Sequence, residues 1–444
     1  MRKTADHQLP LTPTVQCHSH IAELEEISRI LDKNPEIAEL AHTDLVRGVR
    51  TDTGAEAKLT ADQVVRATIL YQSNRWSFDE LAFELSYNVA YRKFCRLGFG
   101  QHPSRSTLNR DIGRIGPEAW ETIHRVLIGY AKDIGVEDGK KVRTDCTVMK
   151  ATIHEPTDSS LLSDCMRVLT RQLLRASDVV NVSYSNHCKR AKRRAFEIQN
   201  AKSNKERVPL YLDLLKVTKM TLGYAKRTVA ALKLRKHPLA EAHRSALQET
   251  IDLTIRVIAQ TERRIVHGES VPAGEKIVSI FEPHTDIIRK DRRETLYGHK
   301  LCLSAGASNL ITDCVVLDGN PADSTLTVEM MKRHIEILDQ VPEQVAFDGA
   351  FASIDNLAAL KTLGIDDNCF TKARWAKITD MVKNSWTYKK LRRFRAGVEG
   401  IISFLKRAFG VDRCRRKGLR SFKVYALSSV VSANLLTLAR HALK

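Results

Sequence analysis

The chain contains 444 residues, of which 43% are hydrophobic and 28% are charged. This composition excludes a wholly disordered or fibrous protein and predicts a globular chain, with roughly 100–200 residues in each domain. The formal net charge of +19 indicates a polyanionic partner, and we expect that partner to be nucleic acid.

The positive charge is concentrated in two segments. Residues 189–236 contain fifteen Lys or Arg against three acids, and residues 372–420 contain sixteen against three. A solvated helix face explains any single lysine equally well. The asymmetry as a whole favours a long footprint on a phosphate backbone.

The nine cysteines are scattered, with no C-x-x-C pair. They predict a reduced, intracellular protein without structural zinc. The first residues lack the apolar core of a signal peptide, and no apolar run is expected to approach the roughly 20 residues of a membrane span. We therefore expect a cytoplasmic protein with no membrane partner.

The N-terminal part, residues 1–135, is predicted to be a helical DNA-binding domain. A short amphipathic helix is expected at 22–31, and residues 61–135 have helical periodicity. Ser77 and Glu80 form a capping box that opens one helix. A later helix begins near Ser104 and exposes a set of polar and basic side chains: Arg105, Asn109 and Arg110. Helix-turn-helix DNA binding fits this pattern, and so does a plain helical bundle.

A strand is expected at 141–155, within a segment at 136–156 that separates the two helical regions. Residues 157–270 return to helix and form a basic insertion. From 271 to 444, strand patterns at 276–282, 299–307, 311–319, 344–352 and 368–374 alternate with helices at 323–338, 354–364, 386–409 and 422–443. This order predicts an α/β fold with a mixed sheet and flanking helices.

Two aspartates lie in or at the end of apolar strands. Asp145 is in the middle of the first strand, and Asp348 is at the end of a later one. A buried, unpaired carboxylate costs several kcal/mol in order-of-magnitude terms, and a divalent cation is one compensating partner. A pair with Arg143 would explain Asp145 without a metal, and an ordinary turn would explain Asp348 followed by Gly349.

A third acid lies in a basic helix. Arg395, Glu399 and Lys406 have the spacing R-x3-E-x6-K, which places all three on one helical face. A lone glutamate among cations suggests a metal ligand beside phosphate-binding side chains. The alternative is a simple salt bridge between Arg395 and Glu399.

These segments resemble the DDE transposases of bacterial insertion sequences. VRTDCTV is similar to the strand with the first aspartate, VAFDGAFAS to the segment with the second, and FRAGVEGIISFLKRAFG to the Tyr-x2-Arg-x3-Glu-x6-Lys signature. RRETLYGHKLCLSAG resembles the next strand of this group, and IHEPTDSSLLSDCMRVLTR resembles the ISNCY-like subgroup. The Tyr position of the signature is Arg392 here. The resemblance covers roughly residues 60–440.

The resemblance implies an RNase H-like sheet in which Asp145, Asp348 and Glu399 bind two Mg²⁺ ions, with Mn²⁺ as a substitute. It implies cleavage at the transposon end and transfer of the 3′-hydroxyl to target DNA. It also implies terminal inverted repeats as the DNA partner and a homodimer when two ends are paired. The expected DNA contacts in the catalytic part are Arg395, Lys406, Arg392, Arg407 and Lys300. An inactive DNA-binding or repressor derivative, and a nuclease or resolvase without strand transfer, are the alternatives.

Overall fold

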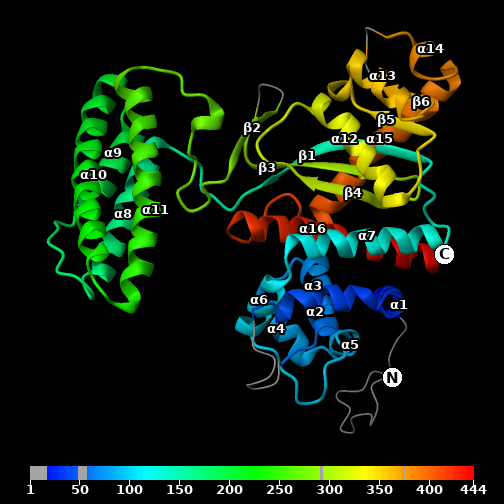
Figure 1. The fold of residues 1–444 in the computed structure, drawn as a ribbon, viewed down its shortest axis with the longest axis horizontal. Helices are drawn as coiled ribbons and strands as arrows, with labels where there is room; N and C mark the ends of the chain where they lie inside the picture. Colours follow the sequence, from blue (N-terminus) through cyan, green and yellow to red (C-terminus); the bar gives the residue numbers. More distant parts are fainter. Residues whose placement is uncertain (1–17, 49–57, 291–293, 372, 374–375) are drawn as a thin grey trace, which may run out of the picture.

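The structure is a computed structural model that describes residues 18–48, 58–290, 294–371, 373 and 376–444. Three parts are visible in Figure 1: a layer of N-terminal helices, a mixed sheet with helices on both faces, and a helical bundle that stands apart from the sheet. The bundle is inserted between the first two strands of the sheet.

The N-terminal layer is helical, as predicted. Its helices are α1 (Ser19–Lys33), α2 (Glu36–Val46), α3 (Ala61–Asn74), α4 (Phe78–Tyr87), α5 (Val89–Phe94), α6 (Arg105–Arg114) and α7 (Pro117–Asp133). The predicted capping box is present, because Ser77 accepts from the Glu80 amide and Glu80 accepts from the Ser77 amide. Ser104 caps α6 by accepting from the Thr107 amide.

The sheet has six strands: β1 (Lys141–Lys150), β2 (Asp286–Lys290), β3 (Glu294–Ala305), β4 (Ile311–Val316), β5 (Gln344–Phe347) and β6 (Asp367–Phe370). Its order is β2-β3-β1-β5-β6, with β4 also paired to β3. Strand β3 pairs antiparallel with β1, β2 and β4, whereas β5 pairs parallel with β1 and β6. This mixed sheet with flanking helices confirms the predicted RNase H-like fold class.

The prediction of a strand at 276–282 is wrong. This segment is irregular in the structure, and β2 begins only at Asp286. Ile277 is buried with the inserted bundle, so the apolar pattern is real. Its backbone is satisfied by a side chain: the Ile277 amide donates to Gln260 Oε1, and Gln260 Nε2 donates to the Ile277 carbonyl. A strand partner is therefore unnecessary.

Helices cover both faces of the sheet (Figure 1). They are α12 (Asp323–Leu338), α13 (Ile354–Thr362), α14 (Ile378–Met381), α15 (Ser385–Phe409) and α16 (Leu419–Ala442). One hydrophobic core joins α12 and α13 to β5 and β6. A second hydrophobic core joins α16 and buried residues of β3 to the N-terminal helices. The N-terminal layer and the catalytic sheet therefore share a hydrophobic core.

Helix α16 qualifies the expectation that no apolar run reaches membrane-spanning length. It is long and apolar enough to cross a bilayer by length and composition, but 83% of its most apolar window is buried within the protein. This burial is typical of a core helix, and the helix does not indicate a membrane protein.

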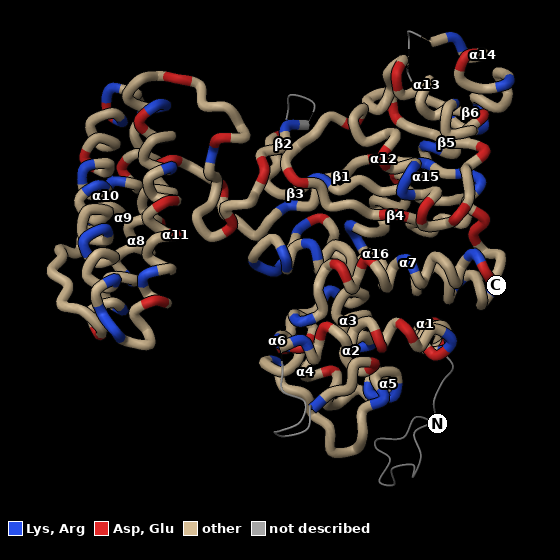
Figure 2. The backbone as a smooth tube through the Cα atoms, viewed as in Figure 1, with Lys and Arg blue, Asp and Glu red and all other residues tan. Residues whose placement is uncertain are grey.

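The insertion consists of α8 (Asp158–Ala176), α9 (Cys188–Asn200), α10 (Asn204–Lys233) and α11 (Pro238–Thr261), followed by a π-helical turn at Glu262–Val266. These helices have a hydrophobic core of their own. Pro209 lies inside α10, near its start. Figure 2 marks the positions of Lys and Arg in blue along the backbone of α9 and α10.

Candidate active site

The sheet register places the two predicted aspartates side by side. Strands β1 and β5 are parallel neighbours, and Thr144 pairs with Phe347. The next residues along the two strands are Asp145 and Asp348. Residues at matched positions of parallel strands point to the same face, so both carboxylates face α15, which contacts β1 and β5.

Arg395 of α15 joins all three predicted acids. Its Nη2 lies 2.8 Å from Asp145 Oδ2 and 3.5 Å from Asp348 Oδ2, and its Nη1 donates to Glu399 Oε1 at 3.1 Å. The guanidinium is only 15% exposed, whereas the Glu399 side chain is 69% exposed. The three acids come from three different elements and converge on one cationic group.

The environment of Asp145 opposes its ionisation. Burial raises the pKa of Asp145 above its ordinary value, and the nearby Asp348 carboxylate acts in the same direction. The Arg395 guanidinium and the Cys146 amide, which donates to Asp145 Oδ1 at 2.8 Å, partly offset this effect. Asp348 accepts from the Thr371 hydroxyl at 3.0 Å. Thr371 follows β6 and was not singled out from the sequence.

The structure decides the three alternatives for the acids separately. The turn after Asp348 is present, because the Phe351 amide donates to the Asp348 carbonyl at 3.1 Å. Arg143 is not the partner of Asp145, because its Nη1 donates to the Phe394 carbonyl of α15 at 2.8 Å. A Cβ at Gly397 would collide with this guanidinium, so a glycine there allows Arg143 to reach α15. The local Arg395–Glu399 salt bridge does exist, but the same guanidinium also holds the two aspartates.

The three acidic side chains suit a divalent cation chemically, but they do not form a complete set of metal ligands in this structure. Among the described residues, no three His, Cys, Asp or Glu side chains are grouped closely enough to hold a metal ion. Asp145 and Asp348 nevertheless converge on one cationic nitrogen, and carboxylate oxygens are the ligands that Mg²⁺ prefers. The exposed Glu399 side chain has room to rotate toward them. The donor chemistry therefore suits Mg²⁺ or Mn²⁺.

The predicted DNA contacts of the catalytic part differ in exposure. Arg392 and Arg407 are exposed on α15, and Lys406 is half-buried. Lys300 is buried: its Nζ donates to the Pro321 carbonyl at 2.7 Å and forms an ion pair with Asp323. Lys300 therefore ties β3 to the start of α12 in this conformation and does not present its charge to solvent.

The predicted contacts of the N-terminal part lie on α6. Arg105 is 69% exposed and lies 3.4 Å from Asp79. Asn109 is exposed, and Arg110 is exposed with its Nε donating to Asp111 at 2.7 Å. The three side chains lie on the solvent-facing side of α6, away from the buried Leu108.

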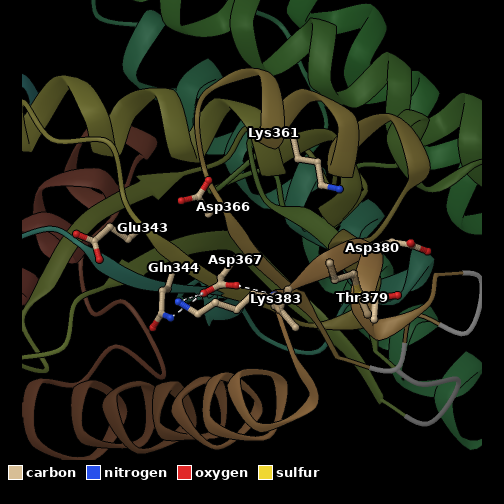
Figure 3. A pocket seen from close by; sticks show the side chains of 10 residues that line it. Glu343, Gln344, Lys361, Asp366, Asp367, Thr379, Asp380 and Lys383 are labelled. Atoms are coloured by element: carbon tan, nitrogen blue, oxygen red, sulfur yellow. Dashed lines mark hydrogen bonds and ion pairs between the residues drawn. The ribbon is translucent and has the colours of Figure 1, made fainter.

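A separate pocket of about 460 Å³ lies at the other end of β5 (Figure 3). Asp367 is at its centre and accepts from Gln344 Nε2 and the Lys383 amide. Gln344 begins β5, whereas Asp348 directly follows its end. The pocket therefore lies at the opposite end of β5 from Asp348, and none of the three acids lines it.

Two family models match the chain. "Transposase domain (DUF772)" matches residues 13–114, and "Transposase DDE domain" matches residues 275–435, including Asp348 and Glu399. The chain belongs to the DDE-type transposases of insertion sequences. Asp145 lies in the segment between the two matches. Neither match distinguishes subgroups within these transposases, so the ISNCY-like assignment stays a prediction.

Part of the chain is also similar to an "Uncharacterized protein ORF8 in nfe locus" from Rhizobium meliloti. The two are 30% identical over 121 residues, which is 26% of this chain and 58% of that relative. The match therefore spans little more than half of the relative. No solved structure matches the chain.

Proposed function

We propose that this transposase cuts DNA at the ends of its insertion sequence and joins the released 3′-hydroxyl to target DNA. The convergence of Asp145, Asp348 and Glu399 on one guanidinium carries this proposal. Three carboxylates on separate elements suit a phosphodiester displacement that uses no protein nucleophile. When bound, two Mg²⁺ ions would activate the attacking oxygen and stabilise the leaving oxygen.

The side chains of the chain itself have distinct tasks in this proposal. Asp145, Asp348 and Glu399 would hold the two cations. Arg395 would bind the phosphate under attack, since guanidinium groups bind phosphate through paired hydrogen bonds. Arg392, Lys406 and Arg407 would contact the DNA end along α15.

We infer separate roles for the other parts of the chain. The N-terminal domain, residues 1–135, binds the terminal inverted repeat, with Arg105, Asn109 and Arg110 of α6 toward the DNA. The insertion, residues 157–270, contributes the basic surface of α9 and α10 to the phosphate backbone (Figure 2). The catalytic domain comprises residues 136–156 and 271–444. Two copies are expected to act together when two ends are paired.

A strand-transfer assay tests the proposed function. A short duplex that ends in the terminal inverted repeat, with a free 3′-hydroxyl, is incubated with supercoiled plasmid, full-length protein and Mg²⁺. We expect joined products that require Mg²⁺. Nicking of intact ends without joining would support a nuclease or resolvase instead, and binding without either reaction would support an inactive DNA-binding derivative.

A further inference from the structure

A fully exposed phenylalanine lies on the turn between α5 and α6. The Phe99 side chain is 101% exposed, and Gly98 and Gly100 flank it. A Cβ added at Gly100 would meet no atom within 4 Å, so the space around the turn is open. Other large apolar side chains of this stretch are exposed as well: Phe83 by 61%, Tyr87 by 74% and Val89 by 72%.

The turn that carries Phe99 is held firmly in place. The Gln101 amide donates to the Gly98 carbonyl, which closes a β-turn. Arg92 donates to the carbonyls of Gly98 at 2.8 Å and Phe99 at 3.3 Å, and also to that of Gln101 at 3.0 Å. Gln101 Oε1 accepts from the Gly98 amide at 2.7 Å. A guanidinium and an amide side chain thus fix the backbone of a fully exposed apolar side chain.

Two exposed cationic residues, Lys58 and Arg105, lie in the segments next to this turn. Gln101 Nε2 donates to the carbonyl of Lys58, which is exposed, and α6 with the exposed Arg105 begins shortly after the turn. The segment between α5 and α6 lies on the side of the N-terminal layer that faces away from α16 and the sheet (Figure 1). A DNA duplex that lies against α6 would meet this turn at the same time.

We propose that Phe99 is a wedge that inserts between base pairs of the terminal-repeat duplex. Apolar side chains used in this way partly unstack a base step and bend the DNA, while neighbouring cations hold the phosphates. The ring would contribute stacking energy without adding a phosphate contact. This inference rests on the proposed binding of transposon-end DNA by the N-terminal domain, and it is independent of the catalytic acids.

The test is DNA binding by the full-length protein in EDTA, so that no cleavage occurs. A terminal-repeat duplex is labelled by scanning 2-aminopurine through one strand, and affinity and fluorescence are measured together. We expect Phe99→Ala to bind about 5- to 100-fold more weakly and to lose the 2-aminopurine signal of an unstacked base. Phe99→Trp should retain both, because its ring also stacks.

The salt dependence separates a wedge from a lost phosphate contact. We expect Phe99→Ala to keep the wild-type slope of affinity against salt, whereas Arg105→Ala should reduce that slope by about one. Because Phe99 is fully exposed, its substitution should leave the melting temperature unchanged. Ile354→Ala, which removes a 70% exposed side chain on α13, is the surface control and should bind like wild type.

Three results would overturn the inference. A DNA affinity of Phe99→Ala within twofold of the wild-type affinity would show that Phe99 does not insert between base pairs. Unchanged DNA affinity combined with altered self-association would make Phe99 a contact between copies of the chain. Failure of the wild-type protein to bind the duplex at all would overturn both the inference and the proposed DNA binding, whereas loss of strand transfer with intact binding would affect only the proposed catalysis.

Discussion

The Arg395 guanidinium lies 2.8 Å from the Asp145 carboxylate, although the two residues are 250 positions apart in the sequence. The same nitrogen lies 3.5 Å from Asp348. The guanidinium offsets the negative charge of the two carboxylates, so it competes electrostatically with a divalent cation for them. Arg395 therefore acts as a counter-ion for the acids in this structure.

Removal of Arg395 should strengthen metal binding. In Arg395→Ala the two aspartates lose a competing cation within 4 Å, and we expect Mn²⁺ to bind roughly 3- to 10-fold more tightly, which corresponds to about 1 kcal/mol. Calorimetric titration of the DNA-free protein measures this. Arg392→Ala, on the same helix but exposed, is the matched control. Weaker Mn²⁺ binding by Arg395→Ala would show that the arginine positions the ligands and does not compete with the metal.

Neutralisation of Asp145 should stabilise the metal-free protein. Because burial raises the pKa of Asp145, the folded state holds the proton more tightly than the unfolded state. The free energy of unfolding therefore falls as pH rises from the ordinary pKa through the raised one. We expect Asp145→Asn to melt a few degrees higher than wild type at pH 7 in EDTA.

The pH dependence gives the check on this prediction. Below about pH 3.5 the Asp145 carboxyl is protonated in both states, and the difference from Asn should disappear. Thermal unfolding at pH 3 and pH 7 measures the difference in melting temperature between wild type and Asp145→Asn. A lower melting temperature of Asp145→Asn at pH 7 would mean that the ion pair with Arg395 outweighs the burial of the charge.

Asp213 should stabilise the inserted bundle at neutral pH. Its carboxylate accepts from Arg190 Nε at 3.1 Å and from Arg194 Nε at 2.6 Å, and these bonds lower its pKa to about 2. A lowered pKa stabilises the fold above the ordinary value of about 4, and this stability is lost as pH falls toward 2. We expect Asp213→Asn to destabilise the bundle by about 1 kcal/mol at pH 7, since solvent screens part of the interaction.

Hydrogen exchange of α9 and α10 amides measures this local stability. Asp252→Asn, at an exposed position of α11, is the control and should change little. An Asp213→Asn effect of the same size at pH 2.5 and pH 7 would contradict an electrostatic origin.

Glu282 should stabilise the packing of the segment before β2 against the start of α16. It is 2% exposed, and its Oε2 accepts from His284 Nε2 at 2.9 Å and from the Gly418 amide at 2.8 Å. His284 Nδ1 continues the network to His299 Nε2 at 2.7 Å. Removal of the carboxylate leaves buried donors unpaired, so we expect Glu282→Ala to lose about 2–4 kcal/mol.

Urea unfolding compares Glu282→Ala with Glu275→Ala. Glu275 is 57% exposed and pairs with Arg263 at the surface, so its removal should change stability by less than about 1 kcal/mol. Equal losses in the two variants would rule out a special role for the buried network.

Local patterns predicted the elements of the fold well, because helix caps and hydrophobic periodicity depend on residues that are close together in the sequence. The helix predicted at 323–338 has those limits in α12, and Ser77 opens α4 as its capping box requires. The predicted strand at 276–282 failed because Gln260, a residue of another element, satisfies that backbone. Periodicity alone cannot distinguish a strand from an apolar segment whose hydrogen bonds are made by side chains.

The site was only partly readable from the sequence. The spacing of Arg395 and Glu399 offered a salt bridge as the alternative to a metal ligand, since i and i+4 share a helical face, and the structure contains that bridge. The contacts of Arg395 with Asp145 and Asp348, and of Thr371 with Asp348, depend on how α15 and β6 lie against the sheet. The burial of Lys300 could not be predicted for the same reason. Its ion-pair partner Asp323 lies at the start of α12, outside the strand pattern that surrounds Lys300.

The most direct test of the account is cleavage of an intact terminal-repeat duplex in Mg²⁺ by wild type and by Asp145→Asn, Asp348→Asn and Glu399→Gln. Asp366→Asn, an exposed acid at the remote pocket, is the matched control. We predict that each of the three substitutions lowers the cleavage rate by at least about 100-fold while DNA binding persists, and that Asp366→Asn cleaves like wild type. Cleavage at the wild-type rate by any of the three variants would contradict the assignment of that residue.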